Sequence, residues 1–511
     1  MPTTNSPAVL EVASTTKGML IPRMTSTQRN SIASPVLGLL VYQTTNPVGL
    51  WSYTGNGWEQ IGTGSGSGSG WGLLGNAGTN PVSNFVGTTD NQALRFRVNN
   101  IQSGEIHPSN GNTGLGYYVL AANTAGVSNT ATGSEALKSN TIGSYNTANG
   151  HFTLSLNTTG SSNTANGTSA LYNNTTGSYN TANGVNTLGA NTTGENNTAN
   201  GYAALRFNTA GGNNTANGTS ALYNNTTGGN NTATGYAALG FNTTGISNTA
   251  NGTSALYNNT TGGNNTATGY GALYSNTAGR ENTANGYFAL YNNKGSYNTA
   301  TGYYALAFNT TGNFNTAFGY SAGSSSVTGN NNTFIGYNAR GIETEFDLNN
   351  VTAIGAGAIV SISNSVRIGN GNVTIIEGQV AFSNPSDKRL KENIVVNNRL
   401  GLNFITQLQP VSYNYISDKT KVRHEGFIAQ DIEKVMNDLN LPFSGLKKSG
   451  DGMYSLAYSD FVMPLVNAVK EQQSQIEELK KENEVLKALV KRVAALEEKN
   501  NQNRLRASAK K

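Results

Sequence analysis

The chain has 511 residues, of which 62 are glycine and only 12% are charged. This length is too great for one compact domain, and the composition is not that of a globular enzyme with a thick aliphatic core. The formal net charge of +5 lies entirely in residues 386–511, which hold 21 basic and 16 acidic residues, whereas residues 1–385 hold 11 of each. Because the C-terminal charges alternate in sign, they indicate a solvated helix face and no nucleic-acid partner.

The residues that usually hold metals and disulfides are scarce. Cysteine is absent, which excludes disulfides and thiolate metal sites, and His107, His151 and His424 show no metal-ligand spacing. We therefore expect no cofactor and no metal. The N-terminus does not resemble a signal peptide, and no apolar run is long enough to span a membrane. This pattern fits a protein that is made and assembled in the cytoplasm, as virion parts are. It equally fits a sequence from which a leader is missing.

The N-terminal residues predict two small β modules joined by a linker. Residues 1–61 contain GLLVYQTTNPVGLWSYTGNGWEQIG, a hairpin pattern in which Leu39, Val41, Trp51 and Tyr53 alternate with polar residues around a turn at Asn46-Pro47. The Gly/Ser run at 62–70 is typical of a flexible linker, and residues 71–111 predict a second small β module.

Residues 112–385 are dominated by an internal repeat of the form Asn-Thr-x-x-Gly. The step is 17 residues, with one single-residue slip near 298, and looser copies follow at Asn350 and Asn364. Such a unit is too short for a pair of helices and suits one coil of a β-solenoid. The repeat begins at Asn112, Asn129, Asn146, Asn163, Asn180, Asn197, Asn214, Asn231, Asn248, Asn265, Asn282, Asn298, Asn315 and Asn332.

The ninth residue of twelve successive copies is leucine, which predicts a continuous buried ridge along stacked coils. We expect two short strands in each coil, alanine at the third and eighth positions inside a narrow core, and asparagine or glycine at turns. The alternatives are a disordered tract or a series of glycosylation sequons. The ridge consists of Leu120, Leu137, Leu154, Leu171, Leu188, Leu205, Leu222, Leu239, Leu256, Leu273, Leu290 and Leu306.

The composition changes sharply at Ser386, where lysine and helical periodicity begin. Residues 386–460 predict a separate domain, and residues 461–511 predict a long coiled-coil helix with a short tail. A single amphipathic helix packed on its own domain is the alternative. Apolar residues alternate at spacings of three and four, interrupted by two polar residues that would set the register. The seam is Val462, Leu465, Val469, Gln472, Ile476, Leu479, Asn483, Leu486, Val490 and Val493.

Three C-terminal motifs occur in order: SDKRLKENI from Ser386, HEGFIAQDIEKV from His424, and YSDFVMPLVNAVKEQQSQIEELKKENEVL from Tyr458. This segment resembles the endosialidase-type intramolecular chaperones, a family of trimerising, self-cleaving serine peptidase modules at the C-termini of phage tail spikes and fibres. The N-terminal modules resemble those of tail-fibre-domain proteins, which implies attachment at that end. The resulting expectation is a mainly β fibre with a repeat β-solenoid shaft, small N-terminal β modules and a C-terminal α+β chaperone domain.

The resemblance implies a cleavage site between Pro385 and Ser386, made by a single-turnover serine endopeptidase of the Ser-Lys type. Ser386 would be the nucleophile and Lys391 its base, with His424 in an assisting position. A lysine serves as a base only when burial lowers its pKa, so we expect assembly to switch the activity on. The alternatives are an N-cap at Ser386-Asp387 and an ordinary surface lysine, and the rigid ring of Pro385 would slow attack.

The function that follows is a homotrimeric fibre for attachment or host recognition, docked by its N-terminus to a tail, baseplate or cell surface. Its receptor would be a cell-surface glycan or protein, and its location a virion tail or the cell exterior. A glycan-degrading spike needs paired carboxylates, whereas the repeats hold only Glu135, Glu195 and Glu281. A purely structural bacterial surface fibre is the third possibility. Candidate ligand contacts are a cation loop at Glu343, Glu345 and Asp347 and glycan-stacking rings at Tyr202, Tyr236 and Tyr303.

Overall fold

The computed structural model describes residues 14–61, 75–80, 82–342, 348–373, 375–379, 384–416, 419–448 and 452–509. The chain divides into two units, Met1–Asn91 and Gln92–Lys511. The Gly/Ser linker at 62–70 and the acidic residues of the expected cation loop lie outside the described residues. None of the helices formed by the described residues combines the length and the apolar character needed to cross a bilayer.

The N-terminal unit contains a four-stranded sheet in the order β1-β2-β3-β4. The predicted hairpin is confirmed, because Val41 lies opposite Trp51 in the antiparallel pair β2–β3. Arg29 lies with its guanidinium 3.8 Å from the centre of the Trp51 ring, and burial lowers the pKa of this arginine. The elements are β1 (Arg23–Met24), α1 (Ser26–Asn30), β2 (Leu40–Gln43), β3 (Gly49–Tyr53) and β4 (Trp58–Ile61).

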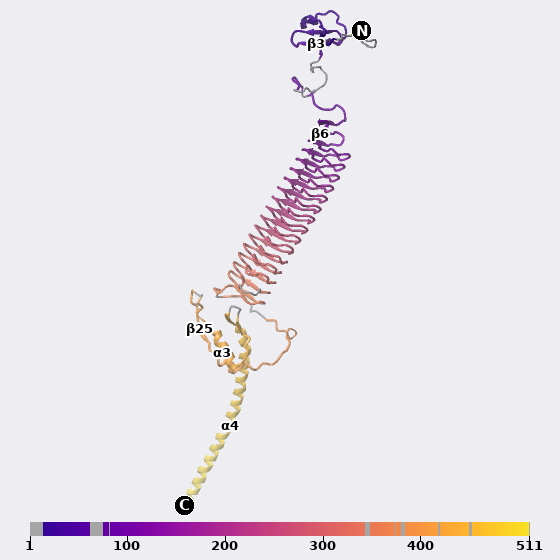
Figure 1. Ribbon diagram of the computed structural model, residues 1–511. Coiled ribbons are helices and arrows are strands. Elements are labelled where there is room, and N and C mark those ends of the chain that lie inside the picture. The colour runs from indigo at the N-terminus through magenta and orange to yellow at the C-terminus, as the bar shows by residue number, and fades with distance from the viewer. Residues whose placement is uncertain are drawn as a thin grey trace. The chain divides into compact units, whose positions relative to one another are not determined.

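The shaft is a β-solenoid in which successive coils stack along the chain (Figure 1). The antiparallel hairpin β5 (Leu94–Val98) and β6 (Ile101–Ile106) pairs with β7 (Thr113–Leu115), and every later strand of the ladder pairs in parallel with the one before it. Within the described part of the chain no pairing joins the end strands β5 and β24, so the sheet is a ladder and not a closed ring.

The remaining strands of the ladder have three residues each. They are β8 (Thr130–Thr132), β9 (Thr147–Asn149), β10 (Thr164–Asn166), β11 (Thr181–Asn183), β12 (Thr198–Asn200), β13 (Thr215–Asn217), β14 (Thr232–Thr234), β15 (Thr249–Asn251), β16 (Thr266–Thr268), β17 (Thr283–Asn285), β18 (Thr299–Thr301), β19 (Thr316–Phe318), β20 (Thr333–Ile335), β22 (Thr352–Ile354) and β24 (Val366–Ile368). A short second ladder, β21 (Arg340–Gly341) with β23 (Ile359–Val360), lies beside the last coils.

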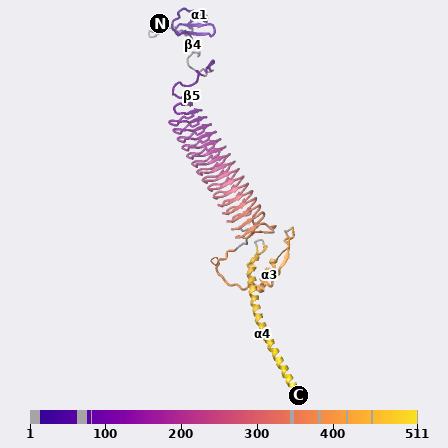
Figure 2. The same ribbon diagram turned by 180° about the vertical axis from the view of Figure 1, so that it is seen from behind.

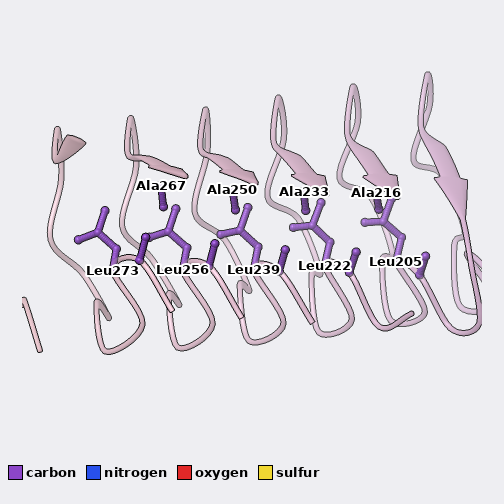
Figure 3. Packing of buried hydrophobic residues seen from close by; sticks show 14 of the residues in the cluster. Leu205, Ala216, Leu222, Ala233, Leu239, Ala250, Leu256, Ala267 and Leu273 are labelled. Carbon is purple, nitrogen blue, oxygen red and sulfur yellow. The ribbon is translucent and has the colours of Figure 1, made fainter. Parts of the chain in front are cut away.

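The predicted leucine ridge is confirmed, since all twelve leucines are buried together with the alanines of the strands. Figure 3 shows leucines such as Leu222 and alanines such as Ala233 repeating from coil to coil in one thin core. The expectation of two strands per coil is wrong for most of the shaft. Each coil has one strand, and the leucine segment forms turns in which leucine adopts a left-handed backbone, with φ of 52° at Leu222.

Buried asparagines provide the polar part of the core. The first asparagine of each coil bonds to its equivalent in the coil before: Asn146 Nδ2 donates to Asn129 Oδ1 at 3.1 Å and to the Gly160 carbonyl at 2.9 Å. A second column bonds in the same way, with Asn157 Nδ2 donating to Asn140 Oδ1 at 2.7 Å. Because each amide both donates and accepts, these columns satisfy buried polar groups across many coils.

The C-terminal region forms a small α+β domain from which a long helix extends. Its core contains Leu400, Phe404, Ile432, Phe443 and Phe461. The helix α4 (Val462–Ser508) has 47 residues and is visible in full in Figure 2, with a length of about 70 Å at 1.5 Å per residue. The other elements are η1 (Lys388–Leu390), α2 (Leu402–Ile405), β25 (Val411–Tyr413), β26 (His424–Gly426), α3 (Ala429–Leu439), β27 (Leu446–Lys448), β28 (Tyr454–Leu456) and η2 (Tyr458–Phe461).

Candidate self-cleavage site

The two residues of the proposed dyad lie at either end of the single turn η1. Lys391 Nζ donates a hydrogen bond to Ser386 Oγ at 2.6 Å. Asp387, and not Ser386, caps this turn, since its carboxylate accepts from the backbone N–H of Arg389 at 2.8 Å. The serine hydroxyl is therefore free of a capping role and is held against the lysine amine, as a Ser-Lys dyad requires.

A charged pair, Asp387 and Arg389, lies within this turn. Arg389 donates from Nη2 to Asp387 Oδ2 at 2.7 Å and from Nε to Oδ1 at 3.1 Å. The hydrogen bonds from Arg389 lower the pKa of the Asp387 carboxyl, and the same contact raises the pKa of Arg389. Asp387 consequently stays ionised at neutral pH. Neither side chain contacts Ser386 or Lys391 among the bonds of the described residues, and both side chains are exposed.

Ser386 and Lys391 are both exposed in the single chain. The residues directly after them are also uncovered: Ile394, Val395 and Val396 are 62%, 81% and 85% exposed. Three consecutive apolar side chains rarely face water in a stable surface, and such patches mark contact sites. The single chain therefore lacks the burial that a lysine base needs, and an apolar segment beside the dyad is available for another chain to cover.

His424 lies in β26, opposite Tyr413 of β25, and its ring is 5.1 Å from that of Tyr415. The described residues give no bond between His424 and the dyad. Its Nε2 is buried and has no hydrogen-bond partner in the described structure. The neighbouring Tyr413 bonds to the Tyr415 hydroxyl, and this bond, together with burial, raises the pKa of Tyr413 to about 12. The fold thus brings Ser386 and Lys391 together and places His424 in a separate tyrosine cluster.

The long helix anchors the segment that follows the dyad. Asn467 Nδ2 donates to the carbonyls of Asn397 and Leu400, both at 3.0 Å, and Glu471 Oε2 accepts from the backbone N–H of Leu402 at 2.8 Å. Sequence reasoning missed these two anchors. In the sequence, only one feature sets Asn467 and Glu471 apart: both are polar, and both lie outside the apolar seam in the first turns of the helix.

The described part of the shaft carries little that resembles a second site. Glu135 pairs with Lys138 at 2.9 Å, and Tyr303 lies stacked between Tyr287 and Tyr320 at 5.1 Å on each side. Because both faces of the Tyr303 ring are covered, that ring offers a ligand only its edge and hydroxyl. In the described ranges, which leave out residues 343–347, no group of three or more histidine, aspartate or glutamate side chains could hold a metal ion.

Two family models match the chain. Residues 386–441 match "Chaperone of endosialidase", of the S74 peptidase family, and residues 2–78 match "Phage tail like trimerisation region". The first match begins at Ser386, the serine of the proposed dyad described above. The comparison with curated proteins returned no match.

Proposed function

We propose that three copies of this chain, a phage-type tail fibre protein with an N-terminal trimerisation region and a C-terminal chaperone of endosialidase, form an attachment fibre. After assembly, each copy removes its own chaperone by cleavage between Pro385 and Ser386. A phage tail fibre is a part of the virion and acts outside the cell. The observation that carries the cleavage is the 2.6 Å contact between Lys391 Nζ and Ser386 Oγ.

The proposed reaction is hydrolysis of one peptide bond, with no cofactor. Neutral Lys391 takes the proton of Ser386 Oγ, which attacks the carbonyl carbon of Pro385. The C–N bond breaks, an ester to Ser386 Oγ forms, and the proton passes to the released amine of Ser386. Water then hydrolyses the ester and regenerates the hydroxyl. Each chain cuts once, so the activity has a single turnover.

Assembly is the proposed switch. Lysine is a base only as the neutral amine, and burial away from water favours that form. In our proposal, neighbouring chains cover Val395, Val396 and the adjacent dyad when the trimer forms. The apolar seam of α4 supports this proposal, because residues such as Val469 and Leu479 are 62% and 61% exposed in one chain and would be buried in a three-stranded coiled coil.

His424 is proposed as an assisting group that acts across a chain interface. Its Nε2 is buried without a hydrogen-bond partner in the described structure, so a bond to a neighbouring chain requires its surroundings to rearrange on assembly. Replacement by alanine is expected to slow cleavage and leave the dyad able to react, whereas loss of Ser386 or Lys391 abolishes it.

The test is a denaturing gel of the expressed chain and its variants. We expect the unchanged chain to give two fragments, residues 1–385 and residues 386–511. Ser386→Ala and Lys391→Arg should each give one full-length band, since arginine keeps the charge of lysine but does not act as a base. Lys388→Arg, on the same turn, is the matched control and should still cleave. A single full-length band from the unchanged, assembled chain would contradict self-cleavage.

The attachment role is proposed from the domain combination, with the N-terminal unit docking to the particle and the shaft or its end contacting a cell-surface glycan or protein. Binding of the purified, cleaved fibre to intact host cells tests it. Fibres that assemble and cleave but bind no host surface would instead support a purely structural role.

A further inference from the structure

One outward face of the shaft repeats the same residue type at one position of successive strands. Each of the fifteen strands β7–β20 and β22 begins with threonine, from Thr113 to Thr352, and the middle residue of each strand points into the core. The first and third residues point outward and are exposed or half-exposed. We call these outward residues the threonine face.

The fold of one chain does not explain this uniform threonine. The hydroxyls of a different threonine column do bond between coils, as when Thr226 Oγ1 donates to the Thr243 carbonyl at 3.0 Å. Within the described part of the chain, no such bond is made by the first threonine of any of the fifteen strands. Strand preference alone would also admit valine, isoleucine or tyrosine at an exposed position. A contact from outside the chain is the remaining physical reason for keeping one residue type.

The chemistry of the face suits a second copy of this chain. The described residues between 113 and 354 include eight charged side chains, and none of them lies on the threonine face. About a three-fold axis, identical residues of three chains meet at the same height, so a charge there would face two like charges. Hydroxyl and amide groups, which both donate and accept, can pair with copies of themselves.

The two ends of the face are apolar. Its third positions hold Leu115 at the first coil and Phe318, Ile335 and Ile354 at the last coils, all exposed in the single chain. A slip by one coil between chains would place Leu115 against Thr132 and Phe318 against Thr301. The ends therefore supply the register that the nearly identical central coils do not specify.

We infer that the threonine face is the surface by which three shafts pack against one another about the fibre axis, an inference that rests on the proposed trimer. Fifteen strands about 4.8 Å apart, each about 10 Å long, present about 700 Å² per chain, close to the ~800 Å² that each partner buries in a stable interface. The stacked tyrosines, such as Tyr303, and the charged side chains then lie outside this contact.

The absence of cysteine allows a clean cross-linking test. Thr249→Cys puts one thiol on the threonine face, and Thr261→Cys puts one on the turn of the same coil; both side chains are exposed. Disulfides need Cα atoms within about 7 Å, as near a three-fold axis. We expect oxidation of the assembled fibre to give disulfide-linked dimers with Thr249→Cys and only single chains with Thr261→Cys. Thr232→Cys and Thr244→Cys repeat the comparison one coil away.

Light scattering on the same samples separates the two proposals. A monomeric mass for the unchanged chain would overturn the trimeric fibre. A trimeric mass without cross-linking at residues 232 and 249, or with equal cross-linking at residues 244 and 261, would overturn only the assignment of the threonine face.

Discussion

At the scale of single residues, the first asparagine of each coil shows why one side chain is repeated without change. Asn231 Nδ2 donates to Gly245 O at 2.9 Å and to Asn214 Oδ1 at 3.1 Å, and its Oδ1 accepts from the backbone N–H of Asn248 at 3.0 Å. The site needs a short, neutral group that donates and accepts at once. Aspartate would bury a charge, and a hydroxyl has too few protons.

Replacing this residue should therefore be costly. Asn231→Ala leaves the Asn248 N–H buried without its acceptor, whereas the Gly245 carbonyl keeps its bond from Asn242 Nδ2. An unsatisfied buried group costs about 1–3 kcal/mol. We expect faster thermal unfolding of the fibre than with Asn258→Ala, in the neighbouring coil, whose side chain is half-exposed. Unfolding half-lives at one elevated temperature give the comparison; equal half-lives would show that the asparagine column contributes no stability.

At the scale of the coil, left-handed backbone is the dominant feature. Leucine at φ near +50° costs roughly 1–2 kcal/mol, and complete burial of its side chain returns about 1.5–3 kcal/mol. The strain is thus sustained only while the next coil covers the leucine. The expectation of two strands per coil was wrong for this reason. The leucine segment is buried, as its apolar pattern predicts, but its left-handed residues form turns between the three-residue strands.

Glycine at the fifth position of each coil is required by close stacking. Gly235 has φ +123°, and a Cβ there would lie 2.8 Å from the backbone of Gly252 in the next coil. We expect Gly235→Ala to prevent assembly or greatly reduce the yield of folded trimer. Gly229→Ala is the control, because serine and glutamate occupy its column elsewhere, at Ser178 and Glu195. Equal yields of folded trimer, measured by size-exclusion chromatography, would contradict the stacking argument.

At the scale of the whole molecule, the repeats create an alignment problem that the proposed role of the C-terminal module would solve. Nearly identical coils can pair out of register, and a module that trimerises first would set the register. Removal of the module afterwards would leave a shaft that cannot readily refold, so its stability becomes kinetic.

A chain that ends at residue 385 tests this directly. We expect it to give aggregates or mixed oligomers, whereas the uncleavable Ser386→Ala chain, which keeps the module, forms uniform trimers. After denaturation, the cleaved fibre should fail to refold and the Ser386→Ala chain should recover, as measured by light scattering. Uniform trimers from residues 1–385 alone, at the yield of the intact chain, would show that the module is not needed for assembly.

The sequence by itself determined the period, the leucine ridge and the change of composition at Ser386, because each depends on spacing or composition along the chain. The pairing of Ser386 with Lys391 was expected from the resemblance of the C-terminal motifs to a known family. Only the tertiary structure decided the left-handed turns, the bonds of the asparagine columns and the separation of His424 from the dyad. It also decided the anchoring of Leu402 by Glu471, 69 residues away. These features depend on which backbone atoms neighbouring coils or distant elements present to one another, and that information is absent from local spacing.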